Sequence, residues 1–275
     1  MSHFTVLVVG DNPEQQLEPF NENLEVTPYF EPVDMEDMAE YYKVKPTAEA
    51  LRNYVFAWTG YAPIEQGDKL GYMCTYNPSS KWDWYSLGGR WTGFFKVKPG
   101  AQAKVGEPGV FDNSADPGTA DQLRLQDIDW EAMHEEAEIM AHCMYTEMEL
   151  NTAGLERPAE AWIQCRERFD NIDEAREAFH KNAWVAVAGK ATFADPVEHY
   201  CILNGGRDTF VKKAKHSVGV PFAVLMDGVW YERGSMGWWG AVSGEQDMDE
   251  WCIQVDQLMR DLPGDTLVSL YDCHI

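Results

Sequence analysis

Basic residues are scarce in this sequence. Its 22 Lys and Arg stand against 46 Asp and Glu, which gives a formal net charge of -24 at pH 7. Affinity for DNA, RNA or an acidic membrane surface depends on basic side chains that contact phosphates and release counterions. We therefore expect neither direct nucleic-acid binding nor association with a membrane.

Long apolar runs and paired cysteines are also missing. No run approaches the roughly 18 to 20 apolar residues of a membrane-spanning helix. The apolar segment FTVLVVG (residues 4–10) is too short for a signal peptide and lacks a basic leader. The six cysteines include no C-x-x-C pair, which predicts reduced thiols rather than disulfides or a zinc knuckle. We expect a cytoplasmic protein.

Common nucleophile and phosphate-loop motifs do not occur either. The sequence has no G-x-S-x-G, no P-loop and no G-x-G-x-x-G after a predicted strand. Any site must therefore be sought in less familiar combinations of residues.

Hydrophobic spacing predicts an α+β fold. Hydrophobic residues make up 45% of the chain, enough to bury a core. Apolar runs at 3–10 and 266–275 predict strands, and FAVLMDGVWYERG (222–234) predicts a hairpin that turns at Asp227-Gly228. Apolar residues recur at helical spacing within 129–150 and 245–265.

The order of these elements predicts the domain organisation. We expect residues 1–120 and 217–275 to form a core with a mainly antiparallel sheet, and residues 121–216 to form a mainly helical insertion or second lobe. The strand–helix–strand ending is also compatible with a ferredoxin-like core. The acidic segment up to Pro46 is expected to be a wrapped loop with a short helix at 35–42.

The stretch KWDWYSLGGRWTGFF (81–95) is unusually aromatic. It predicts two strands, 82–87 and 91–97, joined at Gly88-Gly89 by a hairpin-like turn. Sheet packing explains its aromatic residues, Trp82, Trp84, Phe94 and Phe95. The turn belongs to one of two basic islands in this acidic chain, which contain Lys81, Arg90, Lys96, Lys98 and Lys104 in the first and Arg207, Lys212, Lys213, Lys215 and His216 in the second.

Two segments predict a ligand pocket. Gly-Gly-Arg turns expose backbone N–H groups and a guanidinium that suit an anion, and the glycines of GSMGWWG (234–240) suit the edge of a pocket. Tryptophan would stack on a base or sugar ring while arginine pairs with phosphate. The candidate ligand-binding residues are Gly88, Gly89, Arg90, Trp91, Arg233, Trp238 and Trp239. Core packing and tight turns explain the same residues, so both interpretations stay open.

The two ends of the chain carry candidate catalytic residues. His3-Phe4-Thr5 matches H-x-[ST], half of the motif of two-histidine phosphoesterases, and no second copy occurs. If the first and last strands are antiparallel neighbours, His3 lies beside Asp272 and His274, which share a face of their strand. These residues predict an acid–base site with Thr5, or a divalent-metal site formed by His3, Asp272 and His274. A polar strand end that simply reaches water is the alternative.

Two Glu-x-x-His motifs, Glu131 to His134 and Glu177 to His180, lie on predicted helices. Such pairs ligate di-iron centres in helical bundles. Because the chain is rich in Glu and the other two helices of such a bundle cannot be identified, solvated helix faces are the preferred explanation.

Five segments together resemble a family of uncharacterised proteins carried by bacteriophages, prophages and scattered bacteria. They are MSHFTVLVVGDN, NPSSKWDWYSLGGRWTGFF, ADQLRLQDIDW, WYERGSMGWWGAVS and LPGDTLVSLYDCHI. The resemblance runs from one end of the chain to the other and implies a phage-linked setting in the host cytosol. Accessory proteins in that setting often interfere with host enzymes or immune signals. No activity, cofactor or catalytic residue comes with it.

Three hypotheses follow. The first is an accessory protein that acts by binding, as a counter-defence factor that inhibits a host protein or sequesters a nucleotide-like anion. The alternative is a metal- or histidine-dependent phosphoester hydrolase that acts on a nucleotide-like substrate, with Thr5 and Arg90 on the phosphate. The third is a purely structural or interaction role.

Overall fold

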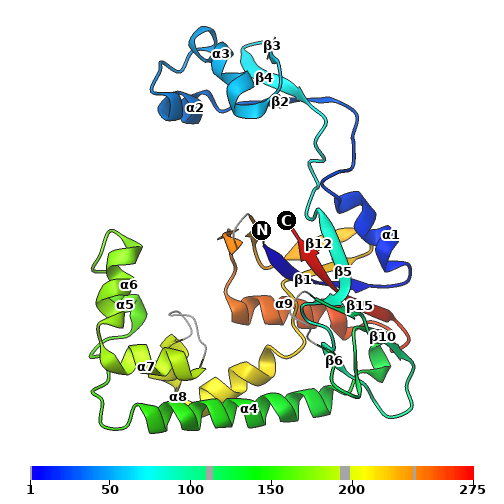
Figure 1. The fold of residues 1–275 in the computed structure, drawn as a ribbon, viewed down its shortest axis with the longest axis vertical. Coiled ribbons are helices and arrows are strands. Elements are labelled where there is room, and N and C mark those ends of the chain that lie inside the picture. The colour runs from blue at the N-terminus through cyan, green and yellow to red at the C-terminus, as the bar shows by residue number, and fades with distance from the viewer. Residues whose placement is uncertain (1, 110–113, 193–198, 238–239) are drawn as a thin grey trace.

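The computed structural model describes residues 2–109, 114–192, 199–237 and 240–275. It confirms the predicted α+β fold with mainly antiparallel sheets. A central sheet, a helical lobe and a small projecting module can be followed along the chain (Figure 1).

The central sheet has the strand order β12-β11-β1-β15-β10-β7. Strand β5 pairs with residues 271–274 of β15, and β8 pairs with the other end of β5. The strands of this sheet are β1 (His3–Val9), β5 (Trp84–Gly89), β7 (Ala103–Lys104), β8 (Glu107–Pro108), β10 (Gln122–Arg124), β11 (Ala223–Met226), β12 (Val229–Glu232) and β15 (Leu267–His274). The β11–β12 hairpin turns at Asp227-Gly228, as the sequence predicts, and both of these residues have positive φ.

Strands β1 and β15 are antiparallel neighbours, which is the condition under which the sequence brings His3 beside Asp272 and His274. Their register runs from His3 opposite His274 to Val9 opposite Val268. Six of the seven β1 residues are buried. A continuous apolar run like that of β1 is typical of a strand covered on both faces. The other neighbour of β1, strand β11, runs parallel to it. This pairing differs from a ferredoxin-like core, in which the sheet is antiparallel throughout.

Each face of the sheet is covered. On one face, Leu7 and Leu270 pack against Trp251 and Val255 of helix α9 (Met248–Arg260). The Trp251 indole is fully buried and donates its N–H to the Pro221 carbonyl at 2.7 Å. The opposite face packs against Trp82 and against helices α1 (Pro13–Leu17) and η1 (Glu18–Phe20).

The aromatic stretch does not form the predicted hairpin. After β5 the chain turns away, and β6 (Phe95–Lys96) pairs with β9 (Thr119–Ala120) rather than with β5. The remaining short elements are β13 (Ser235–Met236), β14 (Val242–Ser243) and η2 (Leu125–Asp127).

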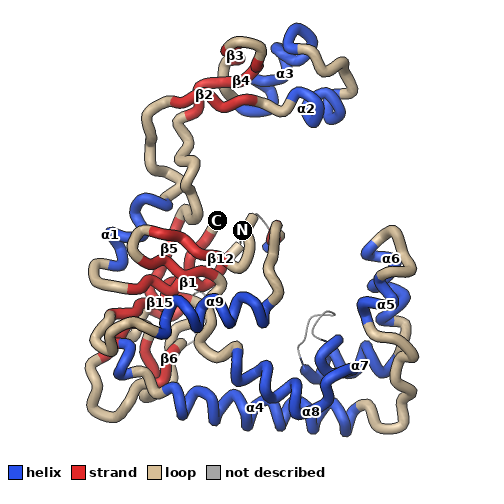
Figure 2. Tube along the Cα trace, turned by 180° about the vertical axis from the view of Figure 1, so that it is seen from behind, coloured by secondary structure: helices blue, strands red, loops and turns tan. Residues whose placement is uncertain are grey.

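The helical lobe leaves the sheet along the long helix α4 (Trp130–Asn151), whose first turn is capped by the Asp129 carboxylate. It continues through α5 (Trp162–Arg166), α6 (Ile172–His180), α7 (Ala183–Thr192) and α8 (His199–His216). Helices α4 and α8 lie side by side in both views (Figures 1 and 2). The lobe has its own core, built on Tyr145, Met148, Trp162, Phe179 and Trp184.

A small module projects from the sheet at the other end, and it begins in the segment where the sequence predicts a wrapped loop with a short helix. It contains β2 (Tyr29–Pro32), α2 (Met35–Tyr42), α3 (Ala48–Thr59), β3 (Pro63–Gln66) and β4 (Lys69–Cys74). The strands pair in the order β2-β4-β3. Leu51 and Val55 of α3 pack on Met38 and Leu70 to form a separate core.

No helix in the described part of the chain combines the length and apolar character needed to cross a membrane.

We predict that Leu51→Ala unfolds the projecting module without loosening the central sheet. Leu51 is fully buried in the module core, and loss of a buried leucine costs about 2–5 kcal/mol. Hydrogen exchange should show faster exchange in α2, α3 and β4 and unchanged protection in β1 and β15. The control Leu270→Ala, in the sheet core, should speed exchange in β1 and β15 and leave the module unchanged. Faster exchange in β1 of Leu51→Ala would contradict the independence of the two cores.

Candidate functional site

His3 and His274 meet at one end of the β1–β15 pair. They are directly opposite in register, so their side chains share a face of the sheet. The ring centroids are 4.8 Å apart and the rings are tilted by 70°. The side chains are 14% and 13% exposed, so neither imidazole is completely buried.

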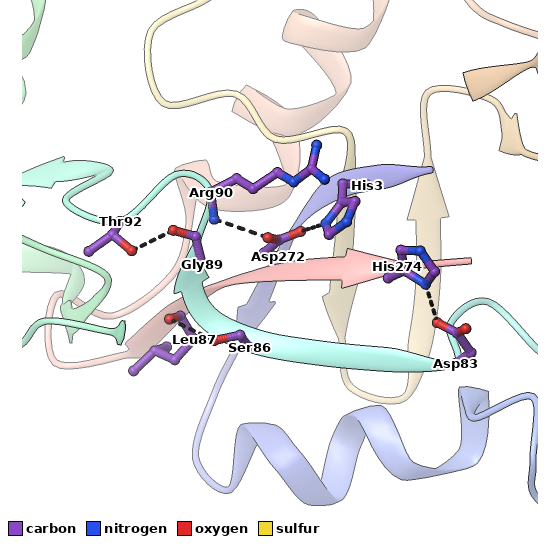
Figure 3. Close-up of polar contacts among 9 residues, drawn as sticks. All are labelled: His3, Asp83, Ser86, Leu87, Gly89, Arg90, Thr92, Asp272 and His274. Atoms are coloured by element: carbon purple, nitrogen blue, oxygen red, sulfur yellow. Dashed lines mark hydrogen bonds and ion pairs between the residues drawn. The ribbon is translucent and has the colours of Figure 1, made fainter. Parts of the chain in front are cut away.

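Each imidazole is held by its own carboxylate. His3 Nδ1 lies 2.8 Å from Asp272 Oδ1, and His274 Nδ1 lies 2.6 Å from Asp83 Oδ1 (Figure 3). A carboxylate oxygen can only accept a hydrogen bond, so each Nδ1 carries the hydrogen and donates it. This tautomer leaves the lone pair on Nε2 of both rings.

Asp272 is buried and its second oxygen is also engaged. The side chain is 1% exposed, and Oδ2 accepts the Arg90 backbone N–H at 3.0 Å. Gly89 passes so close that a Cβ there would lie 2.4 Å from the Asp272 Cβ, and its φ is +52°. Only glycine fits at position 89 without a shift of this carboxylate.

Asp121 is a second buried carboxylate under the same turn. It is fully buried and accepts the backbone N–H groups of Gly93, Phe94 and Gly106 at 2.7, 3.1 and 2.8 Å. Burial raises the pKa of Asp121, although the three hydrogen bonds act to lower it. A Cβ on Gly88 would come within 2.6 Å of Asp121 Oδ2. The Gly-Gly-Arg turn is thus clamped between two buried carboxylates.

The predicted ligand-binding residues that the structure describes have different surroundings. Gly88 and Gly89 face the buried carboxylates, and Trp91 packs against the main core. The Arg90 side chain extends toward His3 (Figure 3). The Arg233 guanidinium donates instead to Glu245 and to the Met248 sulfur. Trp238 and Trp239 lie outside the described residues.

Trp84 differs from its predicted role in sheet packing. It is 50% exposed because β5 lies at the edge of the sheet there, and its ring is edge-on to His3 with centroids 6.2 Å apart. Trp82 is buried, as expected. The half-exposed indole gives the two-histidine end of the sheet an aromatic wall.

Thr5 lies next to the pair but is occupied. It is opposite Asp272 in register, and its Oγ1 accepts the Phe222 backbone N–H at 2.8 Å. The hydroxyl therefore fixes the start of β11. Its direct contact with a substrate stays a prediction.

The metal role of His3, Asp272 and His274 also stays a prediction. Within the described ranges, no group of three or more His, Cys, Asp or Glu side chains is arranged to hold a metal ion. The two His–Asp pairs use the Nδ1 atoms for hydrogen bonds instead.

Ser2 ties a neighbouring loop to this end of the sheet. Its hydroxyl donates to the Gly237 carbonyl at 2.7 Å and accepts the Gly240 backbone N–H at 2.6 Å. The glycine-rich segment that the sequence marks as a pocket edge is therefore anchored beside His3.

Asp83 and Asp121 were not predicted. A strand that starts at Trp82 places Asp83 and Trp84 on opposite faces of the sheet. In the structure β5 begins at Trp84, so Asp83 lies before the strand and its carboxylate reaches His274. Asp83 also donates its backbone N–H to the His274 carbonyl at 2.9 Å. An acidic residue in a loop, such as Asp121, gives no periodic signal of burial.

No family model, curated protein or solved structure matches this chain. The candidate site therefore depends on its own geometry.

We predict that Asp121 produces a pH dependence of stability opposite to that of a salt-bridged carboxylate. Because burial raises its pKa above the ordinary 3.8, the native state holds the proton more tightly than the unfolded chain. Its contribution to the free energy of unfolding falls as pH rises from about 3.8 to the raised value.

Asp121→Asn presents an amide to one of the three backbone donors and should lose about 1–3 kcal/mol. The stability gap to the native protein should narrow as pH rises through this window, as measured by urea unfolding from pH 4 to 7. The exposed control Asp68→Asn should show no such narrowing. A stability difference between Asp121→Asn and the native protein that widens as pH rises would refute the raised pKa of Asp121.

Proposed function

We propose that this protein binds a small, nucleotide-like phosphoester at the two-histidine site and hydrolyses it by acid–base catalysis. The observation that supports the proposal is the pair of imidazoles 4.8 Å apart, each held through Nδ1 by a carboxylate. In this proposal the two Nε2 atoms, which the carboxylates leave free of their hydrogen bonds, act on one reacting group.

The two imidazoles take complementary roles. One neutral Nε2 accepts a proton from water as the water oxygen bonds to phosphorus. The other ring, in its protonated form, donates a proton to the leaving ester oxygen as the P–O bond breaks. One water is consumed for each ester cleaved, and proton exchange with solvent resets the two rings.

Asp272 and Asp83 are positioning residues in this scheme. Each orients one ring, fixes its tautomer and stabilises the imidazolium form. The anchoring of Asp272 by Arg90 N–H explains why the Gly-Gly-Arg turn lies against the site.

The charge of the protein and the exposed Trp84 ring support a small, nucleotide-like substrate. The formal charge of -24 disfavours a polynucleotide, whereas the Arg90 side chain brings a positive charge toward His3 (Figure 3). The half-exposed Trp84 offers a surface on which a base can stack.

Capture without cleavage is the second candidate, and the exposed Trp84 favours it because stacking alone can retain a nucleotide. In either form, removal of a nucleotide-like signal would suit a phage-type accessory protein in the host cytosol that counters a defence. A host protein is the alternative partner in that setting.

We predict that His3→Gln and His274→Gln each lower kcat/KM by about 10²–10⁴-fold, the usual contribution of a general acid or base. The assay is phosphate-ester hydrolysis over a panel of cyclic and linear nucleotides at pH 5 to 9. A bell-shaped pH profile should lose one limb in each variant. His180→Gln, on the exposed face of α6, is the matched control and should retain full activity.

Binding measured by calorimetry separates the two candidates. Binding with no turnover in the native protein supports capture. Neither binding nor turnover with any member of the panel, or full activity in His3→Gln, would refute the proposed hydrolase.

A further inference from the structure

A groove lies between α4 and α8, away from the two-histidine site. It has a volume of about 750 Å³, and a second cavity of about 400 Å³ adjoins it toward α9. The two cavities share His134, Lys215 and His216 as lining residues. Together they form one continuous concave surface in the size range of small-molecule sites.

Helix α4 supplies a polar edge to this groove. His134, Glu138 and His142 line it at four-residue spacing, so they lie on one face of the helix. The Glu138 carboxylate forms an ion pair with Lys215 at 2.5 Å, which lowers the pKa of Glu138.

Helices α8 and α9 supply the other charges. Helix α8 contributes Asp208, Lys212, Lys215 and His216, and α9 contributes Asp256 and Arg260. His216 Nε2 lies 3.5 Å from Asp256 Oδ2.

Local charge is balanced in the groove, although the chain is strongly acidic. The three cationic side chains, which are Lys212, Lys215 and Arg260, face the three carboxylates of Glu138, Asp208 and Asp256. Three histidines also line the groove, and each adds a positive charge when it is protonated. In a protein of net charge -24, this is a place where an anion is not repelled.

The cavity toward α9 has an apolar wall. Trp130, Val218, Val255 and Met259 line it, and the Trp130 ring lies nearly parallel to His134 with centroids 6.4 Å apart. A flat, apolar group can pack on this wall while a charged group stays near the histidines and lysines.

We propose that the groove binds a small organic anion: an aromatic body against the Trp130 wall and a single anionic group toward His142, Lys212 and Lys215. An apolar recess with a few convergent polar groups is the usual form of a ligand site. The site is distinct from the two-histidine pair and does not depend on the activity proposed there. It also gives a role to the second basic island of the sequence.

The test uses the full chain and 8-anilinonaphthalene-1-sulfonate, an aromatic anion whose sulfonate keeps its charge between pH 5.5 and 8. Fluorescence titration should give saturable binding that tightens by about fivefold or more at pH 5.5, because protonated histidines add positive charge. Lys212→Gln and His142→Gln should each weaken binding at pH 5.5 by about threefold or more, since one favourable charge is lost.

Lys69→Gln, on β4 of the projecting module, makes the same change in net charge and should leave affinity unchanged. His3→Gln should also bind normally, which separates this groove from the two-histidine site. Circular dichroism confirms that the variants remain folded. Affinity that does not change with pH, or equal affinity in the groove variants and Lys69→Gln, would overturn the proposal.

Discussion

The antiparallel pairing of β1 with β15 is the constraint on which the candidate site depends. It joins the two ends of the chain and places His3 opposite His274 and Thr5 opposite Asp272. Because side chains alternate along a strand, a slip of one residue between β1 and β15 would place the two histidines on opposite faces of the sheet. The buried apolar residues that continue along both strands hold this register, so the packing of the core fixes the geometry of the site.

Two buried carboxylates connect this core to the Gly-Gly-Arg turn. Burial of a carboxylate is costly unless its oxygens are hydrogen-bonded, and backbone N–H groups of the turn region satisfy both Asp121 and Asp272. The glycines are required because the carboxylates occupy the space of a side chain. The Arg90 backbone N–H of the turn binds Asp272, and Asp272 in turn holds the His3 ring. This N–H group therefore binds a carboxylate of the protein itself, whereas the sequence predicts a ligand anion at the turn.

Much of the scaffold could be predicted because hydrophobic periodicity reports burial directly. The terminal strands, the hairpin at Asp227-Gly228 and the helices α4 and α9 follow from this signal. The meeting of His3 with Asp272 and His274 was expected only if the terminal strands were antiparallel neighbours, and the register of β1 and β15 meets that condition. The separate module at 29–74 was not predicted, since its short strands interrupt an acidic segment rich in proline. Asp83 and Trp84 were misplaced because the strand begins two residues later than expected, and Asp121 acts through backbone contacts that leave no pattern.

The most direct test of the central claim is the tautomeric state of the two imidazoles, measured by long-range ¹H–¹⁵N correlation NMR. Assignment comes from the His3→Gln and His274→Gln variants. When the two imidazoles are neutral, both rings should carry the hydrogen on Nδ1 and leave Nε2 unprotonated, because each Nδ1 donates to a carboxylate. A hydrogen on Nε2 with a bare Nδ1 in either ring would contradict the two His–Asp pairs and the acid–base chemistry built on them.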